Sequence, residues 1–266
     1  MELDKICEKM ISAIKEAGKI ILYAHRAEDT VTEKPGTSNF VTEYDLAVQS
    51  FLIDEIKKIL PDAYFLAEEK ENSSDIEKRE ICVVIDPIDG TANFINNYRH
   101  SCISVAILFY GKAVFGAVYD PYQDEMFSAA DGLGAFLNGK RLTVAERPME
   151  RAIVAFGTSP YHKSTLCEKT FSLAEDIFLV ANDVRRSGTA ALDLAYLAAG
   201  RNDIFFEFIL QPWDFAAGYV LVKEAGGIIT DMSGSSIIHG KSSSVIAASR
   251  GLYRAALEKA KKYIEQ

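Results

Sequence analysis

The chain has 266 residues, of which 48% are hydrophobic and 25% are charged, and its formal net charge is −9. This composition is that of an ordinary globular protein that can bury a large core, and the acidic balance disfavours a nucleic acid as partner. The sequence contains no run of 18 apolar residues, so no membrane-spanning helix is predicted.

The start of the chain and its cysteines bear on location. The first residues lack the basic and apolar regions of a signal peptide. The four cysteines have no metal-type spacing and are typical of reduced thiols. We therefore predict a cytoplasmic protein.

Two amphipathic helices are predicted near the N-terminus. Apolar residues recur at helical spacing over residues 3–24. A polar link, residues 28–41, follows and contains Lys34 and the turn signal Pro35-Gly36. Thr42-Glu-Tyr-Asp45 then has the spacing of a capping box, and Pro61 closes the helix that it starts. Asp45 either only caps this helix or also holds a hydroxyl or water of a neighbouring site.

Acidic residues follow two predicted strands. Residues 64–67 form a short apolar strand that runs into Glu68, and residues 69–80 are a strongly polar surface loop. The apolar run 81–85 reads as a strand covered on both faces, and Asp86 and Asp89 come directly after it.

The turn after the second strand has two interpretations. Pro87 cannot continue a sheet ladder, so we expect the chain to turn there. Gly90 would let the backbone approach a ligand closely, and Thr91 supplies a hydroxyl. The alternative is structural, because Asp-Gly is a common hairpin pair and an acid after a strand often caps a helix.

The remaining elements divide the chain into two predicted lobes. Residues 1–148 form an α+β lobe in which the two helices cover a largely antiparallel sheet, whose further strands are 104–110, 113–119, 125–129 and 135–137. Residues 145–151 are the expected hinge. Residues 149–266 form a smaller α/β lobe with strands at 153–156, 178–181, 203–208, 228–231 and 244–248. Its helices are expected at 163–177, from Thr189 to Gly200, from Pro212 to Gly226 and from about residue 250.

A fourth acid joins the group in the second lobe. Asp214 follows Pro212 in the first turn of a predicted helix, where an anion is favoured. Converging carboxylates repel one another unless they bind cations, and oxygen ligands without His or Cys favour a hard cation such as Mg²⁺, Mn²⁺ or Ca²⁺. Such a site suits metal-assisted hydrolysis of a phosphate ester. Thr91, if it is hydrogen-bonded to Asp45, could take the proton from the attacking water.

Several ordered segments carry a family resemblance. Asp86-Pro-Ile-Asp-Gly-Thr91, preceded by Ala67-Glu-Glu69 and followed by Trp213-Asp-Phe-Ala-Ala-Gly218, resembles the inositol monophosphatase family. Three further segments resemble it too, namely Val41-Thr-Glu-Tyr-Asp45, Gly188-Thr-Ala-Ala191 and Glu224-Ala-Gly-Gly227. The resemblance implies a layered αβαβα sandwich and a lithium-sensitive, usually dimeric phosphomonoesterase. Its cofactor would be two or three Mg²⁺ ions, with Mn²⁺ as an alternative.

The resemblance also implies roles for individual residues. The metal ligands would be Glu68, Asp86, Asp89 and Asp214, together with the carbonyl of Ile88. Thr91 and Asp45 would orient the attacking water. The substrate would contact the backbone amides of Gly90 and Thr91, the backbone of Ala190 and the side chain of Glu207.

The chain departs from the family pattern at three places. Ala92 stands where a second Thr is common, and Asn97-Tyr-Arg-His100 replaces an aromatic-Pro-aromatic stretch that bears on the dimer contact. Arg185 and Arg186 could clamp a second phosphate, or they could be surface or interface residues, which is the preferred interpretation.

The leading hypothesis is hydrolysis of myo-inositol 1-phosphate, since Glu207 suits a polyol. Fructose 1,6-bisphosphate and 3′-phosphoadenosine 5′-phosphate are the rivals, for which Arg185, Arg186 and Lys163 are the visible extra cations. A metal-binding scaffold for a protein partner is the alternative from another class. An ATP-dependent sugar kinase is disfavoured, because the sequence lacks a G-x-x-x-x-G-K-[ST] loop.

Overall fold

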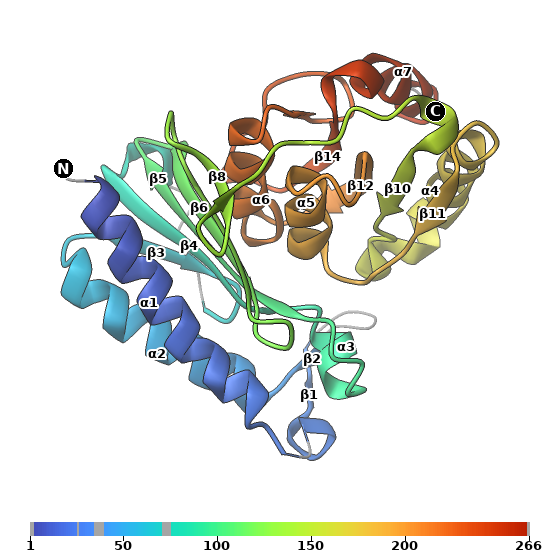
Figure 1. Cartoon of the computed structure of the whole chain (residues 1–266). Coiled ribbons are helices and arrows are strands. Elements are labelled where there is room, and N and C mark those ends of the chain that lie inside the picture. The colour runs from blue at the N-terminus through green and yellow to red at the C-terminus, as the bar shows by residue number, and fades with distance from the viewer. Residues whose placement is uncertain (1–2, 26, 35–39, 71–75, 265–266) are drawn as a thin grey trace.

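The computed structural model describes residues 3–25, 27–34, 40–70 and 76–264 (Figure 1). The predicted turn Pro35-Gly36 and residues 71–75 of the predicted loop 69–80 lie outside this part. Short elements in the described part include the paired strands β1 (Thr32–Glu33) and β2 (Phe40–Val41). The others are the helix α3 (Thr91–Ile95) and the single turns η1 (Ala27–Thr30), η2 (Ile76–Lys78), η3 (Met149–Arg151) and η4 (Pro160–His162).

The two predicted N-terminal helices are confirmed. α1 (Leu3–Leu22) and α2 (Glu43–Ile59) pack on each other and on one face of the first sheet (Figure 1). The predicted capping box is present, because the Thr42 hydroxyl accepts from the first turn of α2 and the Asp45 carboxylate accepts from Thr42 N–H. α2 is therefore fixed at its first turn, which is the turn that carries Asp45.

The first sheet has seven strands in the order β3-β4-β5-β6-β7-β8-β9. β3 and β4 are parallel and the other neighbours are antiparallel, so the predicted largely antiparallel sheet is confirmed. The strands are β3 (Tyr64–Ala67), β4 (Ile81–Asp89), β5 (Cys102–Phe109), β6 (Lys112–Asp120), β7 (Glu125–Ala130), β8 (Gly134–Leu137) and β9 (Lys140–Arg141).

The predicted turn at Pro87 is wrong. β4 continues to Asp89, and its register against β5 shifts between Asp86 and Asp89. Pro87 is tolerated because it lies in this irregularity, where the ladder needs no N–H from it. The Ile88 N–H donates instead to Asp86 Oδ1 at 3.1 Å, and the Ile88 side chain is fully buried. Both acids therefore lie on a pinned strand rather than on a loop.

The second sheet has the order β11-β10-β12-β14-β13 and mixes parallel with antiparallel pairs. Its strands are β10 (Ile153–Phe156), β11 (Asp183–Arg185), β12 (Ile204–Leu210), β13 (Ile228–Thr230) and β14 (Ser243–Ala248). The predicted strand 178–181 is wrong, because α4 (Lys163–Phe178) runs to Phe178 and a turn precedes β11. Leu179 is 73% exposed, so the apolar run reflects an exposed helix end rather than a buried strand.

Helices complete a layered αβαβα sandwich, as predicted. α5 (Ala190–Ala198) and α6 (Pro212–Glu224) lie between the two sheets, and α4 and α7 (Arg250–Lys261) cover the outer face of the second sheet (Figure 1). One cluster of buried residues joins both sheets through α5 and α6 and so crosses residue 148. The division into lobes at that residue stays a prediction. No helix in the described part of the chain is long and apolar enough to cross a membrane.

α6 approaches β6 so closely that a glycine is required. A Cβ at Gly116 would lie 2.4 Å from the carbonyl oxygen of Ala217 on α6. We expect Gly116→Ala to lower the free energy of unfolding by about 1–3 kcal/mol, as overpacking does. Gly251→Ala is the control, since nothing lies within 4 Å of a Cβ there and alanine favours its helix. Urea unfolding checks both, and equal stability of the two variants would contradict the close contact.

Candidate active site

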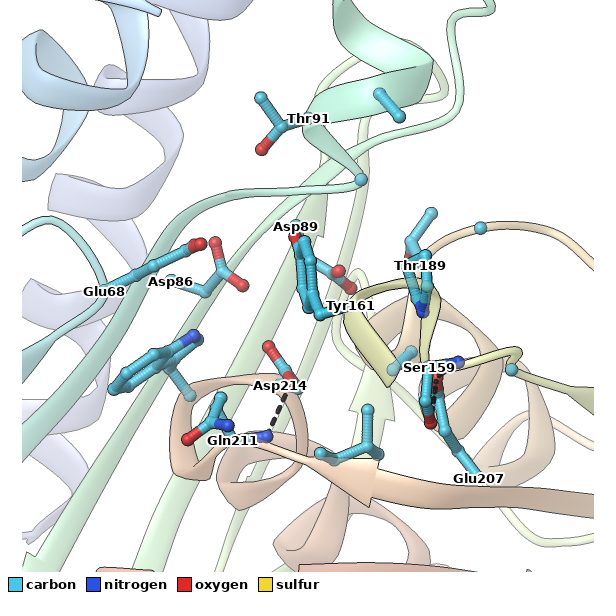
Figure 2. A pocket seen from close by; sticks show the side chains of 18 of the residues that line it. Glu68, Asp86, Asp89, Thr91, Ser159, Tyr161, Thr189, Glu207, Gln211 and Asp214 are labelled. Atoms are coloured by element: carbon cyan, nitrogen blue, oxygen red, sulfur yellow. Dashed lines mark hydrogen bonds between the residues drawn. The ribbon is translucent and has the colours of Figure 1, made fainter. Parts of the chain in front are cut away.

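A cavity of about 630 Å³ opens beside the end of β4 (Figure 2). Its walls come from the end of β4 with the start of α3, the segment after β10, the segment that leads into α5, the end of β12 and the start of α6. Lys34, Phe40 and Glu68 complete the lining. All five residues predicted as metal ligands line it, namely Glu68, Asp86, Ile88, Asp89 and Asp214. The predicted substrate contacts Gly90, Thr91, Ala190 and Glu207 line it as well. The fold therefore gathers residues that are up to 146 positions apart in the sequence.

Three elements, β3, β4 and α6, place the four acids. Glu68 follows β3, Asp86 and Asp89 lie on β4, and Asp214 lies in the first turn of α6. The Ala191 N–H at the start of α5 donates to Asp89 Oδ2 at 2.8 Å, and the Gln211 N–H donates to Asp214 Oδ2 at 2.7 Å. Figure 2 shows that the carboxylate ends point toward a common space between the strands and α6.

Burial and mutual repulsion shift the pKa values of these acids upward. Burial raises the pKa of Asp86 well above its ordinary value, and the three neighbouring carboxylates raise it further. Burial likewise raises the pKa of Glu68 to about 7 and that of Asp89 to about 6, although hydrogen bonds to Asp89 oppose the shift. The pKa of Asp214 is raised well above its ordinary value, first by burial and then by Asp89. The four raised pKa values show that the negative charges in this cluster are not balanced by nearby positive charges.

The donor set fits a hard divalent cation. It consists of carboxylate oxygens with a backbone carbonyl nearby and contains no imidazole or thiolate, which is the chemistry that Mg²⁺ and Mn²⁺ prefer. As they stand, no three His, Cys, Asp or Glu side chains among the described residues form a group that could hold an ion. Binding therefore requires the carboxylates to turn toward the cation. A cation favours this movement because it relieves the repulsion among the four carboxylates.

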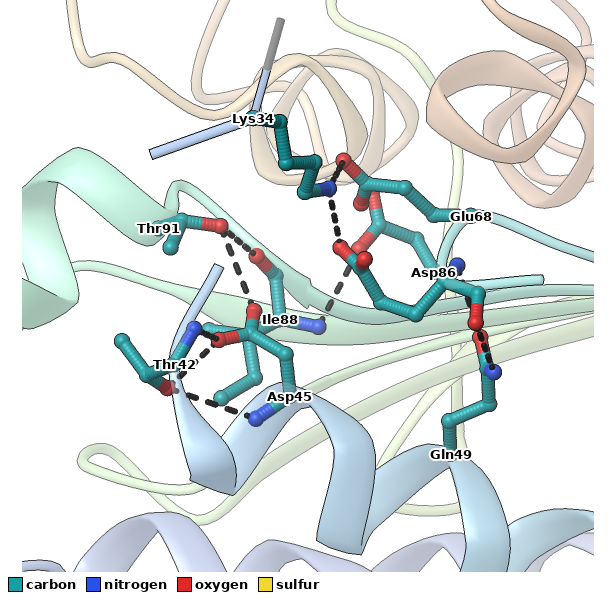
Figure 3. A network of polar contacts seen from close by, with 9 residues as sticks. Lys34, Thr42, Asp45, Gln49, Glu68, Asp86, Ile88 and Thr91 are labelled. Atoms are coloured by element: carbon teal, nitrogen blue, oxygen red, sulfur yellow. Dashed lines mark hydrogen bonds and ion pairs between the residues drawn. The ribbon is translucent and has the colours of Figure 1, made fainter. Parts of the chain in front are cut away.

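The predicted pair Thr91 and Asp45 is brought together (Figure 3). Thr91 Oγ1 lies 3.0 Å from the Ile88 carbonyl oxygen and 3.4 Å from Asp45 Oδ1. The other carboxylate oxygen of Asp45 accepts from the Thr42 N–H at 2.7 Å and from the Thr42 hydroxyl at 2.5 Å. Asp45 thus serves as helix cap with one oxygen and faces the threonine with the other.

The pKa of Asp45 is raised, because burial outweighs the two hydrogen bonds from Thr42. The carboxylate therefore takes up a proton more readily than an exposed aspartate. A proton that leaves Thr91 has an acceptor within reach.

Gly90 gives the chain a sharp change of direction between β4 and α3. Its φ is +88°, which favours glycine, and a Cβ there would lie 3.2 Å from the His100 carbonyl oxygen. The Phe94 N–H bonds to the Gly90 carbonyl, so Thr91 is the first residue of α3. The predicted cradle of Gly90 and Thr91 amides therefore lies where a short helix begins.

Lys34 is a site residue to which sequence reasoning gave no role. Its Nζ lies 2.5 Å from Glu69 Oε1 and 3.5 Å from Glu68 Oε1 (Figure 3). Burial lowers the pKa of Lys34, but the two glutamates raise it more, so the net shift is upward and the amine stays charged. The only signal in the sequence was one lysine in a polar link, which is too common to interpret.

Glu207 lies on the far side of the cavity from Glu68 (Figure 2). Ser159 holds its carboxylate with the backbone N–H at 2.7 Å and the hydroxyl at 3.3 Å. A Cβ at Gly157 would lie 1.8 Å from Glu207 Oε2, so only glycine fits there. Burial raises the pKa of Glu207 to about 7. Ser159 and Gly157 were not predicted, because a short Gly-Thr-Ser turn is not diagnostic on its own.

The predicted extra cations have different surroundings. Lys163 is exposed at the start of α4, and Arg185 is exposed and paired with Asp183 on β11. Arg186 is exposed as well, but it lines the cavity. The two arginines therefore need separate interpretations.

Comparison with known proteins places the whole chain in one group. The model of the "Inositol monophosphatase family" matches residues 2–265. The Escherichia coli (strain K12) protein named "Nus factor SuhB" is 40% identical over 228 residues, which cover 84% of each chain. A Thermotoga maritima IMPase structure is similar with a TM-score of 0.86 and 32% identity, covering 96% of each chain. The extragenic suppressor protein suhB of Bartonella henselae gives a TM-score of 0.88 and 33% identity, covering 96% of this chain and 98% of that one.

Proposed function

The chain belongs to the inositol monophosphatase family, and from this premise we propose that it is a Mg²⁺-dependent phosphatase of small phosphate monoesters. The leading substrate is myo-inositol 1-phosphate. The observation that carries the proposal is the approach of Thr91 Oγ1 to Asp45 Oδ1 beside four carboxylates that line one cavity. A site that only bound metal would need no such threonine–aspartate pair.

The cations would be held by four carboxylates, with the Ile88 carbonyl as a further ligand. The carboxylates are those of Glu68, Asp86, Asp89 and Asp214. Two or three Mg²⁺ ions are proposed, and Mn²⁺ fits the same oxygen donors. When bound, such ions acidify water and neutralise charge on a phosphate. The hydrogen bonds from Ala191 to Asp89 and from Gln211 to Asp214 keep two of these carboxylates oriented before a cation arrives.

The chain's own residues would move the proton. Thr91 has one hydroxyl proton, so it donates a hydrogen bond either to the Ile88 carbonyl or to Asp45. If the proton passes to Asp45 Oδ1, Thr91 Oγ1 can accept one from the attacking water. Thr42 fixes the second oxygen of Asp45, so the first stays aimed at Thr91.

Substrate hydroxyls would bind at the wall of the cavity that lies opposite Glu68. The Glu207 carboxylate accepts from vicinal hydroxyls, which suits a polyol ring. Ala190 would contact the ring with its backbone, and the Gly90 and Thr91 amides would hold the phosphate. Fructose 1,6-bisphosphate and 3′-phosphoadenosine 5′-phosphate remain the rival substrates.

A second candidate comes from the Escherichia coli relative, which is named "Nus factor SuhB" and not phosphatase. On that alternative the chain is a metal-binding scaffold whose main role is to bind a partner. The predicted homodimer, the cytoplasmic location, lithium sensitivity and the lack of a nucleic-acid partner also stay predictions.

The direct test is phosphate release from the three named substrates with Mg²⁺, with and without EDTA. We expect EDTA-sensitive release with a preference for myo-inositol 1-phosphate, because Glu207 accepts from hydroxyls. A preference for a bisphosphate would replace the leading substrate. No EDTA-sensitive release from any of the three would remove the named substrates and favour the scaffold.

A further inference from the structure

Asp193 is a carboxylate of the cavity wall that the proposed mechanism does not use. It lies in the first turn of α5, and the residue is only 3% exposed. Burial raises the pKa of Asp193 well above its ordinary value, although the Ser187 hydroxyl opposes the shift. The charges of Asp89 and Glu207 raise it further, so Asp193 lies within electrostatic range of both. A buried acid beside two others is costly to keep, so its presence points to a role at the site.

One hydrogen bond connects Asp193 to the turn before its own helix. Among the described residues, the one hydrogen bond to its side chain comes from the Ser187 hydroxyl, with 2.7 Å between Oγ and Oδ2. The same hydroxyl accepts from the Thr189 N–H at 3.2 Å. Gly188 lies between these two residues with a φ of +96°, in a region that glycine enters and leaves at little cost. The bond to Asp193 therefore restrains a turn whose own backbone is permissive.

The same turn is bonded to α3, which carries the predicted phosphate cradle. The Asn93 side chain on α3 donates from Nδ2 to the Ser187 carbonyl oxygen at 3.0 Å. A Cβ at Gly90 would lie 3.3 Å from the Gly188 carbonyl oxygen, so the turn also packs directly on the cradle. Ser187 is therefore the residue at which a bond from α3 and a bond to α5 meet.

The turn leads directly into the backbone that holds a predicted metal ligand. Thr189 caps α5, because its hydroxyl accepts from the Leu192 N–H at 3.1 Å. Two residues after this cap, the Ala191 N–H donates to Asp89 Oδ2 at 2.8 Å. Ala190, the predicted ring contact, lies between Thr189 and Ala191. A shift of the turn would therefore displace the donor to Asp89 and the substrate wall together.

We propose that Asp193 is a positioning residue, which acts through Ser187 to hold the turn before α5 and, with it, the N–H that Asp89 accepts. The inference rests on the proposed Mg²⁺-dependent function, and Asp193 itself binds no cation. Groups behind a metal ligand change the metal affinity by about 10- to 100-fold when they are removed, because they orient the ligand before the cation arrives. Asp193 lies one step further from the ligand, so we expect an effect at the lower end of this range.

The test measures the Kd for Mg²⁺ by isothermal titration on the full chain, at a temperature where circular dichroism shows each variant folded. Ser187→Ala and Asp193→Ala each remove the hydrogen bond, and each should raise the Kd about tenfold. The double variant should raise it no further, because both changes remove the same bond. Asp193→Asn should stay within about twofold of the native Kd, since the amide oxygen still accepts from Ser187.

Tyr253→Phe is the control for the loss of a hydrogen bond elsewhere in the chain. Tyr253 on α7 shares a 2.7 Å hydrogen bond with the Thr230 hydroxyl, and neither is among the described residues that line the cavity. The variant should lose stability but keep the native Kd for Mg²⁺. If Asp193 had only a structural role, Asp193→Ala would behave in the same way, which would overturn the proposal.

The remaining outcomes separate this inference from the proposed function. An unchanged Kd in Ser187→Ala, losses that add in the double variant, or a tenfold loss in Asp193→Asn would each overturn the role of Asp193. Ser187→Ala decides alone if Asp193→Ala does not fold, because it leaves every carboxylate of the cavity in place. Native protein that binds Mg²⁺ but releases phosphate from no ester would end the phosphatase proposal and leave these comparisons valid. Native protein that binds no Mg²⁺ would overturn both.

Discussion

Thr91→Ala is expected to lower kcat by about 10²- to 10⁴-fold, the range that a positioned acid–base group contributes. In the proposed mechanism Thr91 Oγ1 joins the attacking water to Asp45, and alanine would leave that water without a route for its proton. The Mg²⁺ affinity should stay nearly unchanged, because the four carboxylates are intact. Steady-state phosphate release and isothermal titration with Mg²⁺ measure the two quantities separately.

Thr91→Ser is the matched control for this prediction. It keeps the hydroxyl and should retain most of the turnover, which excludes a general effect of altering α3. Turnover in Thr91→Ala close to that of the native protein would remove Thr91 from the mechanism. If the native protein has no turnover and both variants bind Mg²⁺ alike, the scaffold alternative gains.

The second large effect is expected for Asp214→Asn. The change removes one carboxylate from a crowded cluster of four, and the amide oxygen can still accept from the Gln211 N–H. Metal-free protein should therefore become more stable, whereas Mg²⁺ should no longer raise its melting temperature. For the native protein, Mg²⁺ at 100 times its Kd contributes about 2.7 kcal/mol, or about 5–10 °C for a chain of this size.

Asp193→Asn is the matched control for Asp214→Asn. Asp193 is also a buried acid whose pKa burial raises well above its ordinary value, but it accepts from Ser187 and is not a predicted ligand. Its variant should keep the full rise in melting temperature with Mg²⁺. An intact Mg²⁺ effect in Asp214→Asn would show that Asp214 does not hold the cation.

The same charges give the metal-free protein an unusual pH dependence. Burial raises the pKa of Glu68 to about 7 and that of Asp89 to about 6, so the folded state binds more protons than the unfolded state between about pH 4 and pH 7. These groups therefore do not lower the free energy of unfolding below pH 4, where they are protonated in both states. They lower it progressively as the pH rises from 4 to 7. With EDTA, Asp214→Asn should lose less stability over this range than the native protein.

The sequence predicted most of the longer strands and the acids at their ends, because the apolar runs and turn residues are local signals. The short strands β1, β2, β9 and β11 were not predicted, since two or three residues give no periodicity. The end of β4 was also missed, since nothing local reveals that Pro87 falls at an irregularity paired with β5. The run 178–181 was read as a strand because a short apolar stretch fits either period, and only packing shows that Leu179 is exposed.

Some features of the site could also be predicted from the sequence, and others could not. Asp45 could be placed at a helix start from its capping box, but its contact with Thr91 depends on how α2 packs on β4. Lys34 beside Glu68 and Ser159 beside Glu207 come from segments with no diagnostic pattern. Such contacts join residues 34 or more positions apart, and one sequence carries no record of that pairing.

The core shared by both sheets also has a consequence for biosynthesis. The face of the first sheet that carries Val84 and Val118 is covered by α5 and α6, which follow it in the chain. At about 5–20 residues per second, translation from Leu137 to Pro212 takes on the order of 4–15 s. During that interval a complete but uncovered apolar sheet face is available to chaperones and to other nascent chains. The segment that delivers Asp214 to the site thus also ends the period in which the chain is most prone to aggregate.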